Sequence, residues 1–268
     1  MKTELTKEIL EKYLNCGMTN RQIAKELGYS KSNIGYFIHK FGLVEKQEKH
    51  KLYNCRIESI DTKEKAYILG FICCDAAIDN KNIVELSVEK SDKEIIDYIS
   101  KIINCRVYTD DTYNKKTRRF PRTRACKKIP DIKTFIGGPS KQDRHFPITK
   151  KEFTRYALLG AFDSDGCLTW GKRKDKNRIW QKISFTTSLK IATGIQNVLI
   201  KELSISTVVR PKTGENCFVL EFANRSDVLK FLDYIYPNDD FIVLNRKYLK
   251  TKALRLELEE NGEGVERQ

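Results

Sequence analysis

Two aspartates, Asp75 and Asp165, stand 90 residues apart, and each ends an apolar stretch with helical periodicity. Both stretches contain small residues, among them Gly70 and Gly160, where large side chains would hold two helices apart. We therefore expect the helices to pack closely and to bring the two carboxylates side by side. Carboxylates that close repel each other, which raises their pKa values unless a cation lies between them. Their oxygen atoms suit hard divalent cations, Mg²⁺ above all, which can activate a water and stabilise the leaving oxygen of a phosphodiester.

The two aspartates belong to an internal repeat. The copies begin KAYILGFICCDAAID and RYALLGAFDSDGCLT, and the same order of patterns follows each. In each copy we predict a helix, two strands, a helix, two strands and a closing helix, which makes an α+β fold. The first copy spans residues 61–150 and the second spans residues 151–256. The second is longer between its aspartate and its next helix, 23 residues against 16, because it contains the basic run Lys172–Arg178.

Individual elements can be placed within the copies. IVELSVE and WQKISFT read as strands, and LKIATGIQNVLIKEL reads as a helix that begins after Ser188. In the first copy, Ser91 with Glu94 three residues later predicts a capping box at the start of the helix DKEIIDYISKII.

Residues 1–45 read as a separate, all-α helix-turn-helix module. Two short helices are predicted on either side of Gly28, and the pattern is similar to modules of resolvases and regulators. The alternative is a three-helix packing unit with no nucleic-acid role. Residues 46–60 are highly charged and without periodicity, and we expect a linker there. Base edges are usually met early in the second helix of such a module, by the residues Lys31, Ser32, Asn33 and Tyr36 here.

The charge of the chain favours a polyanionic partner. Its 268 residues carry 50 Lys and Arg against 36 Asp and Glu, a net charge of +14. Residues 101–150 hold 14 basic and 4 acidic residues, and residues 170–190 hold 7 and 1. Nucleic acid is the first candidate for the partner, an anionic membrane is the second, and a solvated basic surface is the remaining alternative. The tail over residues 257–268 is acidic and is expected to be disordered.

Other classes of protein are disfavoured by the composition. No apolar run approaches the roughly 18–20 residues of a membrane span, and the first residues are too charged for a signal peptide. The 8 cysteines form no CxxC pair, so we expect them to be reduced, in a cytoplasmic protein. With only 3 histidines, zinc fingers and histidine-based nuclease motifs lack their ligands.

The repeat resembles the two halves of a LAGLIDADG homing endonuclease. The family's motif is similar to ILGFICCDA at Ile68–Ala76 and to LLGAFDSDG at Leu158–Gly166. The stretches IGGPSKQDRHFP and PNDDFIVLNRKYLK also resemble the ends of the family's two halves, so the likeness covers roughly residues 61–256. It implies two pseudo-symmetric αββαββα half-domains whose sheets form saddles on double-stranded DNA.

The resemblance also implies an activity, namely site-specific double-strand cleavage by a monomer at a long, asymmetric target. Mg²⁺ or another divalent ion such as Mn²⁺ would be held by Asp75 and Asp165, with the backbone carbonyls of Cys74 and Ser164 as further ligands. Basic residues near the metals would support catalysis. The candidates are Lys141 and Lys247, with Lys90 as a rival in the first copy.

The first copy departs from the family's pattern. Cys73 stands where an acid is common, and Ala76 replaces the final glycine. The second copy keeps Asp163, Asp165 and Gly166. Asp163 lies two residues before the helix end and therefore points elsewhere, so it is the less expected ligand.

Strands of the two saddles would present alternate side chains to DNA. Arginine can read guanine edges in the major groove, and lysine more often meets phosphate. The candidate contacts from the repeat are Arg118, Arg119, Arg122, Arg124, Lys172, Arg173, Lys174, Arg178 and Lys182.

Two alternative functions share the expected fold. One is a transcriptional regulator that binds DNA without cleaving it, although such proteins have lost the acids that are retained here. The other is an RNA-splicing maturase. For the endonuclease we expect a free-standing or intron-encoded gene of bacterial or phage origin that serves intron homing.

Overall fold

The computed structural model describes residues 5–15, 20–43, 57, 59–110, 122–173, 178–236 and 241–260. The chain divides into two compact units, Met1–Tyr53 and Asn54–Gln268, and each is treated by itself. No helix among the described residues is both long and apolar enough to cross a membrane.

The first unit contains three short helices, α1 (Lys7–Asn15), α2 (Asn20–Leu27) and α3 (Lys31–Lys40). Gly28 has a φ of 69°, a left-handed conformation that glycine adopts at little cost, and it ends α2. Ser30 then begins α3, because its hydroxyl accepts a hydrogen bond of 3.2 Å from the backbone N–H of Asn33. Leu10, Ile23 and Ile34 are fully buried and come from different helices, so the unit has its own small core.

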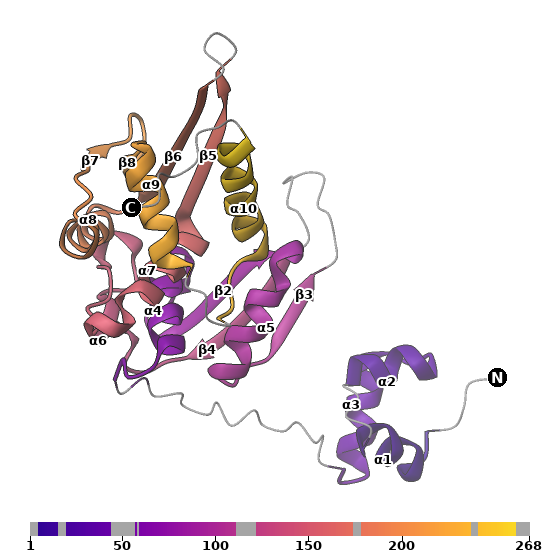
Figure 1. Ribbon diagram of the computed structural model, residues 1–268. Helices are drawn as coiled ribbons and strands as arrows, with labels where there is room; N and C mark the ends of the chain where they lie inside the picture. Colours follow the sequence, from indigo (N-terminus) through magenta and orange to yellow (C-terminus); the bar gives the residue numbers. More distant parts are fainter. Residues whose placement is uncertain are drawn as a thin grey trace. The chain divides into compact units, whose positions relative to one another are not determined.

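The second unit consists of two halves with the predicted order of elements, which confirms the α+β repeat (Figure 1). The first half contains α4 (Lys63–Asp75), β1 (Ala77–Ile78), β2 (Ile83–Glu89), the 3₁₀ turn η1 (Lys90–Asp92), α5 (Lys93–Ile102), β3 (Val107–Asp110), β4 (Arg122–Lys128), α6 (Ile132–Ile136) and the 3₁₀ turn η2 (Lys141–Asp143).

The second half repeats the order and adds one helix. It contains α7 (Lys151–Asp165), β5 (Gly166–Arg173), β6 (Arg178–Thr187), α8 (Leu189–Leu203), β7 (Val208–Pro211), β8 (Phe218–Phe222), α9 (Arg225–Ile235) and α10 (Asn245–Glu260). The strands form two antiparallel sheets with the same topology, β1-β2-β4-β3 and β5-β6-β8-β7.

Each sheet has one face covered by helices and one face that we call its open face. In the first sheet α5 packs on β2 and β4, and in the second α8 and α9 pack on β6. On β4 the side chains of Thr123, Ala125 and Lys127 are buried on the covered face, and those between them lie on the open face. On β6 the open-face residues Trp180, Lys182, Ser184 and Thr186 alternate with the buried residues Ile179, Gln181, Ile183 and Phe185.

Helices α4 and α7 lie side by side between the two halves (Figure 1). A Cβ atom added at Gly70 would lie 2.0 Å from the carbonyl oxygen of Ala157, and one added at Gly160 would lie 2.1 Å from that of Tyr67. Only glycine therefore allows the two backbones to approach this closely. The contact is reciprocal: Gly70 meets Ala157, Gly160 meets Tyr67, and the equivalent positions of the two helices, 67 with 157 and 70 with 160, are 90 residues apart. The close packing expected from the small residues is present.

Local details differ from the sequence expectations at three places. Ser91 lies inside η1 and Asp92 occupies the N-cap position of α5 without a capping side-chain bond, so the predicted capping box is wrong. The acidic tail expected from residue 257 begins inside α10, which continues to Glu260 and buries Leu258. At the other end, Ile57 of the expected linker is 2% exposed and packs in the core of the second unit.

We predict that Gly70→Ala or Gly160→Ala destabilises the second unit by about 1–3 kcal/mol or more, because the added methyl meets backbone atoms that have no room to move. Thermal unfolding followed by circular dichroism measures the effect. Gly35→Ala in α3 is the control, because its added Cβ meets nothing within 4 Å. Wild-type melting of both motif variants would contradict the close contact of α4 and α7.

Candidate active site and nucleic-acid interface

Asp75 and Asp165 are the last residues of the two central helices, α4 and α7. Because these helices touch at their glycines, the two carboxylates lie close enough for the charge of Asp165 to raise the pKa of Asp75. Asp75 keeps an exposed surface, yet the surrounding atoms remove enough water that burial is the main cause of its raised pKa. The charges of Lys141 and Arg122 oppose that rise without cancelling it.

The pKa of Asp165 is also raised by burial, and its side chain is 13% exposed. The charge of Lys141 lowers that pKa in part, and so does the hydrogen bond that Lys141 donates. Both acids thus favour a proton more than an aspartate in water does. A bound cation would relieve the same electrostatic cost.

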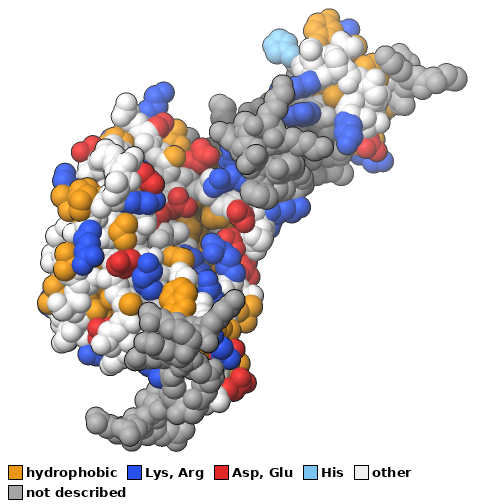
Figure 2. Space-filling model, turned by 90° about the horizontal axis from the view of Figure 1, so that it is seen from above, with side chains coloured by type: hydrophobic (Ala, Val, Ile, Leu, Met, Phe, Trp, Pro, Cys, Tyr) orange, Lys and Arg blue, Asp and Glu red, His pale blue; other side chains and the backbone are white. Residues whose placement is uncertain are grey.

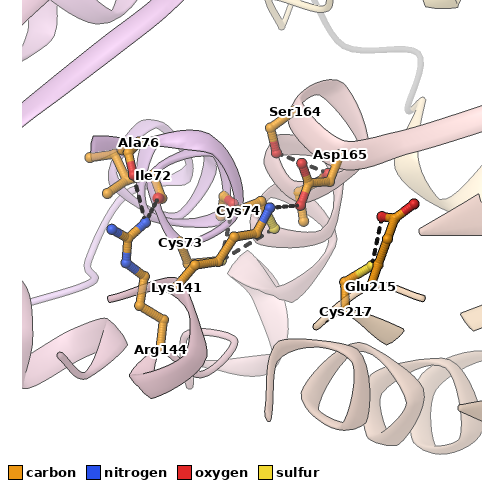
Figure 3. A network of polar contacts seen from close by, with 12 residues as sticks. Ile72, Cys73, Cys74, Ala76, Lys141, Arg144, Ser164, Asp165, Glu215 and Cys217 are labelled. Carbon is orange, nitrogen blue, oxygen red and sulfur yellow. Dashed lines mark hydrogen bonds and ion pairs between the residues drawn. The ribbon is translucent and has the colours of Figure 1, made fainter. Parts of the chain in front are cut away.

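Lys141 connects the two halves at this site. It begins η2 at the end of the first half, and its Nζ atom donates a hydrogen bond of 2.6 Å to Oδ2 of Asp165 in the second half (Figure 3). Its side chain is 35% exposed. Lys141, one of the sequence candidates for a basic residue near the acids, thus forms an ion pair with one of the two paired carboxylates. Lys90 lies exposed in η1.

Lys247 caps the end of α7. Its Nζ atom donates hydrogen bonds to the carbonyl oxygens of Phe162, of Asp163 at 2.9 Å and of Gly166 at 2.6 Å. The residue is 8% exposed, and burial lowers the pKa of its ammonium to about 8. It neutralises the negative end of the helix dipole directly behind Asp165.

Arg144 caps the carbonyl end of α4 as Lys247 caps that of α7. It was not among the candidates predicted from the sequence. Its Nη1 atom donates to the carbonyl oxygens of Ala76 at 2.7 Å and of Ile72 at 3.3 Å, and the residue is 2% exposed (Figure 3). Ile72 and Ala76 stand 90 residues before Phe162 and Gly166, so equivalent carbonyls are capped in both helices. The only sequence signal was its place in IGGPSKQDRHFP, beside Lys141.

Asp163 points away from the paired acids, as its position two residues before the helix end predicts. It is 2% exposed and accepts hydrogen bonds from the hydroxyl of Tyr67 at 2.9 Å and the backbone N–H of Leu244 at 3.0 Å. Burial raises its pKa to about 6. The side chain joins both central helices to the segment before α10. In the first half, Cys73 donates instead to the carbonyl of Gly70.

The donor set fits a hard divalent cation. The carbonyl groups of Cys74 and Ser164 belong to the last helical turns, where carbonyls have no intrahelical N–H partner. Two carboxylates and two carbonyls supply only oxygen, which Mg²⁺ prefers. The described residues contain no group of three or more His, Cys, Asp or Glu side chains suited to hold a metal ion. A groove of roughly 320 Å³ opens beside Asp75 and Ser164 and is also lined by Arg122 and Arg246.

The open faces carry some of the predicted DNA contacts. Arg122 and Arg124 lie on the open face of the first sheet, and Nε of Arg122 is held by the hydroxyl of Ser87 at 2.8 Å. Lys182 lies on the open face of the second sheet. Two exposed aromatic residues that were not singled out, Tyr108 at 50% and Trp180 at 39%, share these faces. In Figure 2 basic side chains lie interspersed with acidic ones over one face of the second unit.

The remaining candidates are placed differently. Lys172 pairs with the buried Ile179, so it lies on the covered face of its sheet, where it forms an ion pair of 2.8 Å with Glu257 of α10. Arg118, Arg119 and Lys174 lie outside the described residues, as do the side chains of Arg173 and Arg178. In the first unit the four candidates of α3 are all exposed, namely Lys31, Ser32, Asn33 and Tyr36.

We predict that Lys247→Met lowers the free energy of unfolding by about 1–3 kcal/mol, because carbonyls at the buried end of α7 lose their donor. Urea denaturation measures the change. Lys250→Met is the matched control, since that lysine is exposed on the same helix. Equal stability of the two variants would exclude a capping role for Lys247.

Comparisons with known proteins agree with this geometry. Residues 152–236 match the LAGLIDADG-like domain family. The LAGLIDADG homing endonuclease I-GzeII, solved in complex with its DNA target, matches with a TM-score of 0.51 and 7% identity over 74% of this chain and 91% of that chain. The homing endonuclease I-WcaI, bound to its DNA recognition sequence, matches with a TM-score of 0.47 and 16% identity over 69% and 84% of the two chains.

The N-terminal LAGLIDADG domain of DUF199/WhiA matches with a TM-score of 0.44 and 13% identity over 69% of this chain and 87% of that chain. No curated protein sequence matches the chain. The resemblance noted in the sequence is thus confirmed. The chain carries a LAGLIDADG-like domain at residues 152–236 and has the fold of the LAGLIDADG homing endonucleases.

Proposed function

We propose that this protein is a site-specific endonuclease that cleaves double-stranded DNA as a monomer. The observation that carries the proposal is the pair of aspartates, Asp75 and Asp165, at the ends of two touching helices between two open sheet faces. The net charge of +14 supports a polyanionic substrate. The fold shared with I-GzeII, an endonuclease solved with its DNA target, supports the same class of substrate.

Asp75, Asp165 and the carbonyls of Cys74 and Ser164 would hold the divalent cations. Bound Mg²⁺ or Mn²⁺ would supply the Lewis acidity that activates a water and stabilises the leaving oxygen of the phosphodiester. Lys141 donates a hydrogen bond to Asp165, so it would place a positive charge beside the scissile phosphate. Lys247 and Arg144 act behind the acids, where they hold the ends of α7 and α4 in position.

The two halves would each bind one half of the target through their open faces. Both halves are in one chain, so no second subunit is needed to complete the pair of acids. Their surfaces differ, because Arg122 and Arg124 lie on one open face and Lys182 with Trp180 lie on the other. We therefore propose an asymmetric target. The helix-turn-helix pattern of the first unit would extend it, through the exposed start of α3.

A non-cleaving regulator is the second candidate. The contact between Lys141 and Asp165 supports it, because an ammonium already neutralises one acid of the pair. The retained acids favour the enzyme, and cleavage assays separate the two functions.

We predict that Asp75→Asn and Asp165→Asn each abolish divalent-metal-dependent double-strand cleavage and leave DNA binding intact, because each removes a ligand charge without changing the shape of the side chain. The measurement is cleavage of a randomised duplex library with Mg²⁺, followed by sequencing of the cut ends. Binding is measured in parallel by gel shift. Full cleavage by either variant would refute the two-acid mechanism, and absence of cleavage by the wild type would favour the regulator.

We predict that deletion of residues 1–45 weakens binding and shortens the footprint on DNA, while slow metal-dependent cleavage remains. The reason is that the deleted residues fall within the first compact unit, whereas both aspartates belong to the second. Hydroxyl-radical footprinting of the full chain and the deletion measures the difference. An unchanged footprint would mean that the first unit has another role.

A further inference from the structure

Each open face carries a glutamate among its basic residues. In the first sheet, Nη1 of Arg124 lies 3.7 Å from Oε1 of Glu85. In the second sheet, Nζ of Lys182 lies 3.0 Å from Oε2 of Glu221. All four side chains are between 40% and 43% exposed, so both members of each pair remain accessible to a ligand.

The two pairs occupy the central strands of their sheets. Glu85 of β2 lies diagonally across from Arg124 of β4, because Arg124 is opposite Ser87. Glu221 of β8 is opposite Ser184 and lies diagonally across from Lys182 of β6. The order of charge is reversed between the halves, since the acid precedes the base along the chain in the first half and follows it in the second. The two faces therefore present different charge patterns at their centres.

A carboxylate at the centre of a DNA-binding face costs affinity for DNA in general. It repels phosphates and reduces the number of counterions that binding releases. The stability of the fold does not explain why glutamates stand on these faces, because ion pairs this exposed contribute little to the free energy of folding. In the major groove, however, a glutamate can accept a hydrogen bond from the exocyclic amine of cytosine, while a neighbouring arginine or lysine can donate to guanine. A glutamate at this place therefore weakens binding to sequences that lack the matching cytosine, whereas a sequence that has it stays bound.

We propose that Glu85 and Glu221 are specificity-determining residues, each of which restricts one or two adjacent positions in one half of the DNA target to G·C pairs whose cytosine presents its N4 amine to the carboxylate. This inference rests on the proposed function. It assigns base reading to the two acid–base pairs at the centres of the open faces. The other basic residues of the open faces would contact the phosphates.

The chain offers a matched control. Glu257 forms an ion pair of 2.8 Å with Lys172, so it has the same chemistry as the other two glutamates. That pair lies on the covered face of the second sheet, beside α10. Glu257→Gln therefore changes the net charge by the same amount as Glu85→Gln and Glu221→Gln, away from the proposed DNA surface.

The experiment compares the wild type, Glu85→Gln, Glu221→Gln and Glu257→Gln in two binding assays without metal. The first selects bound sites from a randomised duplex library, and the second titrates one duplex of scrambled sequence at several salt concentrations. We expect Glu85→Gln to lose roughly 5- to 100-fold of discrimination at one or two adjacent positions in one half of the site. Glu221→Gln should do so in the other half. Both should bind the scrambled duplex more tightly, with a logarithmic salt slope steeper by about 0.9.

The control should match the wild type in the selected sites and in the salt slope. Unchanged selectivity of both open-face variants, or equal effects of Glu257→Gln, would overturn the inference and leave the proposed function standing. If the wild type selects no duplex at all, the proposed function falls and the inference falls with it. Glu85→Ala and Glu221→Ala repeat the test without the amide, and agreement with the glutamine variants is expected.

Discussion

The backbone contact between α4 and α7 at Gly70 and Gly160 determines where everything else in the second unit lies. Each helix ends at an aspartate, and the first strand of each sheet begins within two residues of that end. The distance between the helices therefore sets the distance between the carboxylates and between the two sheets. A residue larger than glycine at either point would separate all of these together, because the neighbouring atoms are backbone carbonyls.

The same contact concentrates negative charge. Two helix C-termini and two carboxylates meet in one place, and the carbonyl end of a helix is itself unfavourable for an acid. The protein offsets this with three cationic side chains from the segments that close each half, two of them buried. Arg144 and Lys247 take equivalent carbonyls of the two helices, and Lys141 reaches one carboxylate. The pKa values of both acids nevertheless remain raised. Further positive charge at the site would therefore be favourable, in agreement with the proposed binding of divalent cations.

The sequence predicted this framework because its signals are local. The apolar periodicity of Leu189–Leu203 and of Ile83–Glu89 gave helix α8 and strand β2 with the right bounds, and the repeat gave the order of elements along each half. The predictions that were wrong or missing concern residues whose roles depend on partners far away in the sequence. Lys172 lies on the covered face because the register of β5 against β6 sets its direction. The roles of Arg144 and Lys247 depend on carbonyls 68 to 85 residues away, which no local pattern reveals.

The two halves differ from each other around the one contact that they share. Equivalent helix ends are capped by arginine in one half and by lysine in the other, and an aspartate at position 163 corresponds to a cysteine at position 73. The strands diverge more. β5 and β6 have 8 and 10 residues, whereas β1 and β2 have 2 and 7. At about 3.3 Å per residue, the hairpin of the second half extends well beyond its counterpart. Two surfaces of unequal length and unlike charge pattern cannot be matched by a palindrome, so the asymmetry of the proposed target follows from the fold.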